Sequence, residues 1–140
     1  MKRNASAVWE GGLKDGKGQL TTQSGVLSNT QYSFSTRFED GIGTNPEELI
    51  AAAHAGCFTM ALSAQLEAAG VRATRLKTTA TVTLEKDNSG FVISAVHLDL
   101  VASIPGSNRE VFDKATAAAK SGCPVSRVLN AKITLDAKLE

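Results

Sequence analysis

Hydrophobic and polar positions alternate along several stretches of the chain, and this period of two predicts strands. Residues 75–85 alternate threonines with apolar side chains, and residues 92–104 carry apolar side chains on one face. The turn sequence DNSG at residues 87–90 joins these two stretches and predicts a long hairpin. Further strands are expected over residues 5–10, 19–26 and 132–139.

Residues 31–38 alternate in the same way, with aromatic residues and threonine at the even positions. We therefore expect a half-buried strand here, with Arg37 on its polar face. An arginine on such a face is usually solvated, and it acquires a role only where a partner subunit covers that face.

A helical period begins near residue 45. Asn45 is expected to be the N-cap and Pro46 the first helical residue, with acidic residues following in the first turn. The pattern runs to Gly70, which suits the C-terminal cap. Residues 51–62 are apolar or small on every side of the helix, so we expect it to be covered all round. The most apolar stretch of the chain is residues 49–66. Polar residues interrupt this stretch, and it falls short of a membrane span.

A second helix is predicted over residues 108–120, and a short one begins at Pro124 with Cys123 as its N-cap. Together with the strands, this order of elements predicts an α+β fold built on antiparallel sheet. Because no repeat, low-complexity tract or linker divides the sequence, residues 1–140 are expected to form a single domain.

Two size arguments predict more than a monomer. Residues 92–104 at about 3.3 Å each would span roughly 43 Å, whereas a compact domain of this length is roughly 37 Å across. The apolar helix also needs cover on all faces, and one modest sheet covers a single face. An intertwined homodimer with these helices at its centre resolves both difficulties.

Composition and charge exclude several classes of function. The 140 residues include 15 Lys and Arg and 14 Asp and Glu. A net charge of +1 gives no excess of positive charge with which to bind nucleic acid or an acidic membrane. Aromatic residues, at 5%, are too few for a base-stacking platform. No apolar run follows the basic N-terminus, so we expect no signal peptide and a cytoplasmic protein. Its two cysteines are then expected to be free, reactive or metal-bound rather than structurally bridged.

The two cysteines stand in different surroundings. Cys57 lies mid-helix among apolar residues, where burial favours an inert thiol unless a cation lies close by. Cys123 precedes Pro124 at a helix start, where free backbone N–H groups stabilise a thiolate. The local sequence therefore makes Cys123 the better thiolate.

His54 lies three residues before Cys57, on the same helix face. The pair could be an activated nucleophile or half of a metal site, which His97 and Cys123 would complete. The spacings match no zinc module, so we predict no metal and interpret His54 as a helix-surface residue.

Four segments carry a resemblance to a known family: AVWEG at residues 7–11, YSFSTRF at 32–38, GTNPEELIAAAHAGCF at 43–58 and SGCPVS at 121–126. Together they resemble the OsmC/Ohr family of thiol peroxidases, and within it the branch of osmotically inducible protein C. The match extends over essentially the whole chain. It implies an OsmC-like fold in which antiparallel sheets wrap around central helices, in an intertwined homodimer with two sites at the interface.

The resemblance also implies a reaction, the reduction of organic hydroperoxides to alcohols in oxidative and osmotic stress defence. Cys57 would be the peroxidatic thiolate that becomes a sulfenic acid, and Cys123 would resolve it as a disulfide. Arg37 would lower the Cys57 pKa and orient the peroxide, and Glu47 would orient Arg37. An external dithiol, often a lipoyl protein in relatives, would reduce the disulfide. No metal, haem or flavin cofactor is implied, and His54 receives no catalytic role.

This assignment requires that Glu47, Arg37 and Cys57 meet in one site. Glu47 and Cys57 are ten residues apart, about 15 Å along an unbroken helix, so they cannot share one site directly. Either the helix breaks near Ala55-Gly56, or Arg37 bridges the gap, or residues come from both subunits.

Two other functions stay open on the sequence. The fold could serve a non-catalytic protein that binds a small apolar ligand, although the retention of all four polar site residues favours the enzyme. The cysteines could also form a structural disulfide, and closing such a long separation would stabilise the native state by roughly 4 kcal/mol.

Overall fold

The computed structural model describes residues 1–106 and 108–140, and its contacts gather in two compact units, residues 1–49 and residues 50–140. Within the described residues, each unit holds a three-stranded sheet, and helices accompany both sheets. The α+β class is therefore confirmed. A single domain over residues 1–140 stays a prediction.

In the first unit, β1 (Ala5–Glu10), β2 (Lys17–Thr22) and β3 (Thr30–Tyr32) form an antiparallel sheet in that order. The strand expected over residues 19–26 thus begins and ends earlier. A turn with Gly25 in the left-handed region, at φ 79°, follows it and leads toward β3.

The strand predicted over residues 31–38 is wrong in its second half, because Phe34–Phe38 form a short helix, α1. Ser33 starts this helix with a capping box. Its hydroxyl accepts the Thr36 backbone N–H at 3.3 Å, and the Thr36 hydroxyl accepts the Ser33 backbone N–H at 2.8 Å. The phenylalanines at the two ends of α1 pack with ring centroids 5.0 Å apart. A pair four residues apart fits a helix and an alternating strand equally well, which is why the alternation misled.

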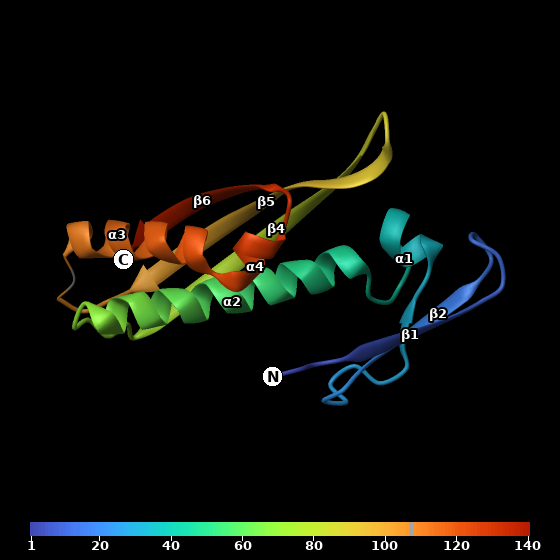
Figure 1. Ribbon diagram of the computed structural model, residues 1–140, viewed down its shortest axis with the longest axis horizontal. Helices are drawn as coiled ribbons and strands as arrows, with labels where there is room; N and C mark the ends of the chain where they lie inside the picture. Colours follow the sequence, from blue (N-terminus) through green and yellow to red (C-terminus); the bar gives the residue numbers. More distant parts are fainter. Residues whose placement is uncertain (107) are drawn as a thin grey trace. The chain divides into compact units, whose positions relative to one another are not determined.

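The second unit is built on a long hairpin, in which β4 (Arg75–Asp87) pairs antiparallel with β5 (Gly90–Ser103) as predicted. β6 (Lys132–Leu139) lies beside β5 in parallel, so the predicted antiparallel sheet is wrong for this one strand. The reason is the crossover between them. α3 (Arg109–Gly122) and α4 (Pro124–Val128) carry the chain back along the sheet before β6 begins (Figure 1).

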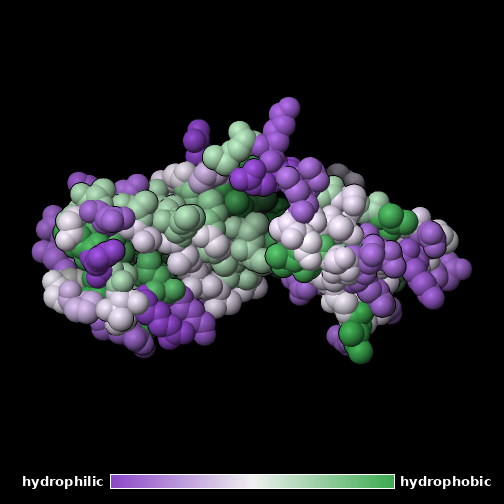
Figure 2. Space-filling view, turned by 90° about the horizontal axis from the view of Figure 1, so that it is seen from below, coloured by the Kyte–Doolittle hydropathy of each residue, from purple (hydrophilic) through white to green (hydrophobic). Residues whose placement is uncertain are grey.

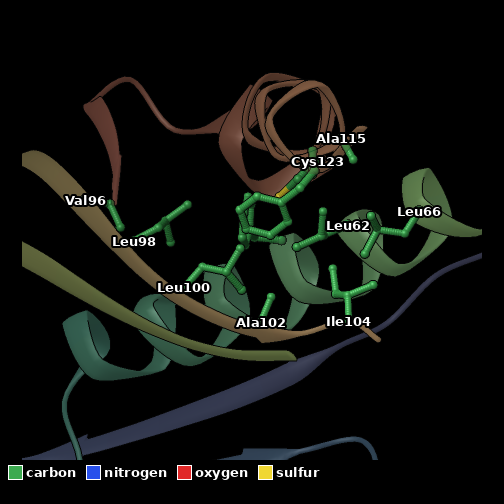
Figure 3. Close-up of a cluster of buried hydrophobic side chains, with 12 residues drawn as sticks. Leu62, Leu66, Val96, Leu98, Leu100, Ala102, Ile104, Ala115 and Cys123 are labelled. Carbon is green, nitrogen blue, oxygen red and sulfur yellow. The ribbon is translucent and has the colours of Figure 1, made fainter. Parts of the chain in front are cut away.

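α2 (Pro46–Ala68) begins as predicted, with the Asn45 side chain accepting the Glu48 backbone N–H at 2.8 Å. The chain leaves the helix at Gly70, whose φ of 76° suits the C-terminal cap. One face of α2 is buried at every fourth residue, and this stripe packs with β5 and α3 as the core of the second unit (Figure 3). The stripe consists of His54, Phe58, Leu62 and Leu66.

The opposite face of α2 is uncovered within one chain, so one chain does not supply the cover on all faces that we expected the homodimer to provide. Met60 is 78% exposed, and pale-green atoms spread over much of the surface on the side where α2 lies (Figure 2). With a mean hydropathy of 1.4 in its most apolar window, α2 is also long and apolar enough for a membrane span, which we had not expected. The core helix of a soluble protein meets the same test, but such a helix is mostly buried, whereas 22% of this window is buried in one chain.

Candidate functional site

The two cysteines predicted to react lie together in the second unit. Cys57 is in the middle of α2, and Cys123 links the end of α3 to the start of α4. Their Sγ atoms are 2.9 Å apart, and both are free thiols. A disulfide has a sulfur–sulfur length of about 2.05 Å, so closing the bond requires a shift of only about 1 Å. Two thiols from distant segments are thus in position for a dithiol–disulfide cycle.

The two sulfurs differ in access from solvent. Cys123 is fully buried among the core side chains, as Figure 3 shows, whereas Cys57 is half-buried. A molecule that arrives from solvent therefore meets Cys57 first, without displacing any of the core.

The protonation of the two thiols is unequal. Burial raises the pKa of the Cys57 thiol, and its hydrogen bond with Cys123 raises it further. Burial opposes ionisation of Cys123 too, but hydrogen bonds from Cys57, Ser126 and Val125 together lower its pKa below the ordinary value. Of the two, Cys123 is therefore the thiol that ionises more readily, as the local sequence predicted. Cys57 needs a cation to become a nucleophile.

In the first unit the structure brings together the two other predicted residues. Nε and Nη2 of Arg37 bond the same Oε1 of Glu47, at 2.9 and 2.8 Å. The Glu47 side chain is largely buried, and its Oε2 has no hydrogen-bond partner among residues 1–106 and 108–140. Because 39% of the Arg37 side chain is exposed, this pair presents a fixed and accessible cation.

α2 runs without a break from Pro46 to Ala68, so a helix break near Ala55-Gly56 is wrong. Glu47 and Cys57 therefore lie ten residues apart on one helix, about 15 Å along its axis. Of the three ways to join them in one site, two stay open. Either Arg37 bridges the distance, or the site takes residues from both subunits.

His54 is not the helix-surface residue that we expected, because it is the first member of the buried stripe of α2. Its side chain is fully buried, and its Nε2 lies 2.7 Å from the hydroxyl oxygen of Ser126. Its Nδ1 is buried without a hydrogen-bond partner in the described part of the chain. Burial lowers the pKa of His54, which favours the neutral ring.

Sequence reasoning missed Ser126 altogether. The available signal was spacing: His54 lies three residues before Cys57, and Ser126 three residues after Cys123. Each pair shares one turn, so a contact between the two cysteines also brings the other two residues together.

The second histidine lies elsewhere, on β5. Nε2 of His97 is within 3.3 Å of Asp99 and 3.2 Å of Asp136, and both aspartates are exposed. In the described residues, this trio is the only group of three or more His, Cys, Asp or Glu side chains close enough to share a metal ion. The four-residue set of both cysteines and both histidines is not assembled.

A pocket that the sequence did not reveal lies in the first unit, beside Arg37. Its volume is about 310 Å³, and aromatic side chains form most of its wall. The residues that line it together with Arg37 are Trp9, Leu13, Tyr32, Ser33, Phe34 and Phe38. An apolar wall next to a guanidinium suits a ligand with an alkyl or aryl group and a polar end.

Comparison with known proteins assigns the chain to a family. The family model described as OsmC-like protein matches residues 39–138. The chain belongs to the OsmC family. It is 51% identical over 140 residues to the Peroxiredoxin OsmC of Escherichia coli (strain K12), across 100% of this chain and 98% of that relative. The OsmC/Ohr resemblance expected from the four sequence segments is thus confirmed.

Ohr proteins are also related to this OsmC-family chain. The Organic hydroperoxide resistance protein OhrB of Bacillus subtilis (strain 168) is 32% identical over 125 residues, which is 88% of each chain. A crystal structure of an organic hydroperoxide resistance protein from Elizabethkingia anophelis matches with a TM-score of 0.72 at 26% identity. That match covers 100% of this chain and 99% of the other, so the OsmC-family fold extends over the whole sequence.

Proposed function

We propose that this OsmC-family protein reduces organic hydroperoxides to alcohols through its two cysteines, in defence against oxidative and osmotic stress. The chain is a thiol-dependent peroxidase, because it is 51% identical over its full length to a peroxiredoxin. The single observation that carries the proposed mechanism is the 2.9 Å approach of Cys57 and Cys123 from segments 66 residues apart.

Cys57 is the proposed peroxidatic residue. Its thiolate attacks the distal oxygen of the hydroperoxide, the O–O bond breaks, and the alkoxide leaves and takes up a proton to become the alcohol. The Cys123 thiolate then attacks the Cys57 sulfenic acid, forms the disulfide and expels hydroxide, which becomes water. An external dithiol, such as a lipoyl group, reduces the disulfide and is itself oxidised. No metal, haem or flavin cofactor takes part in this proposed cycle.

Arg37 is the proposed activating cation, and Glu47 is its positioning partner. Because burial and Cys123 raise the Cys57 pKa, a guanidinium close to Cys57 is needed to favour the thiolate. Glu47 engages two nitrogens of Arg37 through one oxygen. The remaining N–H groups of the guanidinium fork are then available to orient a peroxide oxygen.

The aromatic pocket beside Arg37 supports organic hydroperoxides as the substrate class. An alkyl or aryl group that packs against Trp9, Phe34 and Phe38 leaves water, and each buried CH₂ contributes about 0.8 kcal/mol to binding. Hydrogen peroxide offers no apolar group to this wall, so we expect it to be the poorer substrate.

The proposed assembly is an intertwined homodimer in the cytoplasm, with no nucleic-acid or membrane partner. The uncovered face of α2 borders an open hollow of about 720 Å³ against β4, which Gly56, Met60 and Leu76 help to line. A second copy that covered this face would remove the exposed apolar surface from water. It would also bring a second cation, the partner's Arg37, into the assembly.

The intact mass of the reduced protein after one equivalent of tert-butyl hydroperoxide tests the proposal. The wild type should lose about 2 Da within seconds to minutes as the disulfide forms, whereas Cys57→Ser should stay unchanged. Cys123→Ser should gain about 16 Da, the mass of one oxygen on Cys57, because no second thiol captures the sulfenic acid.

A wild-type mass that stays unchanged over minutes would contradict the proposed function. The non-catalytic binding of a small apolar ligand would then be the better account of the aromatic pocket. A large fall in the melting temperature on adding reductant, without any reaction with peroxide, would instead favour a structural disulfide.

A further inference from the structure

His54 and Ser126 connect the two segments that carry the cysteines. His54 lies one turn before Cys57 on α2, and Ser126 lies one turn after Cys123 on α4. Nε2 of His54 is 2.7 Å from Oγ of Ser126, and the backbone N–H and hydroxyl of Ser126 both bond the Cys123 sulfur. Because His54 is fully buried, this link is part of the core and not a solvent contact. A polar link inside an apolar core requires an explanation.

If His54, Ser126 and Cys123 are hydrogen-bonded in series, their hydrogen atoms can be placed in only one way. A hydroxyl has one hydrogen, so a Ser126 hydroxyl that donates to Cys123 must accept a hydrogen from His54. His54 is then the neutral tautomer with its hydrogen on Nε2, and its buried Nδ1 is a bare acceptor without a partner in the described chain. Donors aligned in series polarise one another, so the histidine strengthens the hydrogen bond from Ser126 to the sulfur.

We infer that His54 and Ser126 are positioning residues for the resolving step, and that they hold the Cys123 sulfur 2.9 Å from the Cys57 sulfur and stabilise its thiolate. This inference rests on the proposed function, in which Cys123 attacks the Cys57 sulfenic acid. In that step the S–S bond forms, the S–O bond breaks, and hydroxide leaves with its electron pair and becomes water with the proton that Cys123 released to solvent when it ionised. The hydrogen-bonded chain makes deprotonation of Cys123 easier. The earlier attack of Cys57 on the peroxide does not use it.

The test separates the two steps in time. Samples quenched after one equivalent of tert-butyl hydroperoxide are analysed by intact mass, where a gain of about 16 Da reports the sulfenic acid and a loss of about 2 Da the disulfide. In Ser126→Ala and His54→Leu the sulfenic acid should form no more slowly than in the wild type, because the charge of Cys123 opposes ionisation of Cys57. The disulfide should form about tenfold more slowly, as for a rise of one unit in the Cys123 pKa. His54→Gln, whose amide nitrogen can donate near the Nε2 position, should restore the wild-type rate.

Thr116→Val is the matched control, because it removes another buried hydroxyl of the same unit, one that bonds the Asp113 carbonyl at 2.9 Å. Equal slowing of both steps, or the same selective slowing in Thr116→Val, would overturn the inference. A wild-type rate of disulfide formation in Ser126→Ala would also overturn it. If His54→Leu does not fold, Ser126→Ala alone is sufficient for the test. A wild type that forms no disulfide at all would instead overturn the proposed function.

Discussion

Access from solvent, more than acidity, distinguishes the two thiols. Cys123 has the lower pKa, but it is fully buried and lies against the Cys57 sulfur. Cys57 has the raised pKa, but it is half-buried and can be reached from solvent. A thiolate of low pKa is also intrinsically a weaker nucleophile. The pair therefore combines an accessible sulfur that needs a cation with a buried sulfur that ionises more readily.

Cys57→Ser should retain a thiolate that forms below the ordinary thiol pKa of about 8.5. The hydrogen bonds from Ser126 and Val125 to Cys123 survive this change, and the new hydroxyl can donate in place of the Cys57 thiol. The ultraviolet absorbance of the thiolate, followed as the pH rises, measures the midpoint. A single step at or above the ordinary value would contradict the assignment of the thiolate to Cys123.

His54 should make the fold sensitive to acid. Burial lowers its folded-state pKa, so at a pH between that value and about 6.5 the unfolded chain binds a proton that the folded chain does not. The free energy of unfolding should therefore fall as the pH falls through this range, by at most about 1.4 kcal/mol per pH unit. His54→Gln has no such proton, so its stability relative to the wild type should improve from pH 7 to pH 5 in urea unfolding. A relative stability independent of pH would show that His54 is not held neutral by burial.

Elements with local signals at their ends could be predicted from the sequence. Asn45 and Gly70 delimit α2 because capping chemistry is local, and the DNSG turn at residues 87–90 fixes the β4–β5 hairpin for the same reason. α1 could not be predicted, because its phenylalanines fit both periods and only the Ser33–Thr36 capping box decides between them. The parallel direction of β6 depends on the path of α3 and α4 over the sheet, which no local pattern encodes.

The same distinction applies to the site. The family resemblance predicted Cys57 and Cys123, and the structure brings the two sulfurs together. The contact between His54 and Ser126 requires α4 to pack on α2, and the sequence places these residues 72 positions apart. Their role stayed hidden because tertiary packing, not spacing alone, creates the contact.

Ser33→Ala should weaken α1 and, with it, the wall of the aromatic pocket. The substitution removes the hydroxyl that caps the Thr36 backbone N–H, at a typical cost of about 1 kcal/mol. Because α1 carries Arg37 and two pocket phenylalanines, kcat/KM for a bulky hydroperoxide should fall more than kcat/KM for hydrogen peroxide. Ser28→Ala, at an exposed loop position, is the control and should change neither. An equal loss of kcat/KM with both peroxides would show that α1 does not determine substrate selection.

The uncovered face of α2 is the feature that one chain leaves unexplained. A helix that is long and apolar enough for a membrane span, yet buried along one stripe only, has further apolar surface to cover. In the proposed homodimer a second copy of the chain would cover this face without a membrane and would fill the open hollow between α2 and β4. Light scattering of the wild type should therefore give twice 14.6 kDa, and Met60→Glu should lower that mass. Val26→Glu, at an equally exposed loop position, should not lower it.

Mixed dimers can decide which subunit supplies the cation. Glu47 and Cys57 are ten residues apart on one unbroken helix, about 15 Å along its axis, so we expect Arg37 to serve the Cys57 of the partner subunit. Cys57→Ser and Arg37→Ala homodimers should each lose at least about a hundredfold in kcat/KM, as for loss of a charge-stabilising donor. When the two variants are refolded together in equal amounts, half of the dimers are mixed. Each mixed dimer pairs one intact Cys57 with one intact Arg37. About a quarter of wild-type activity should return, whereas no recovery, with mixed dimers verified by mass, would mean that Arg37 acts within its own chain.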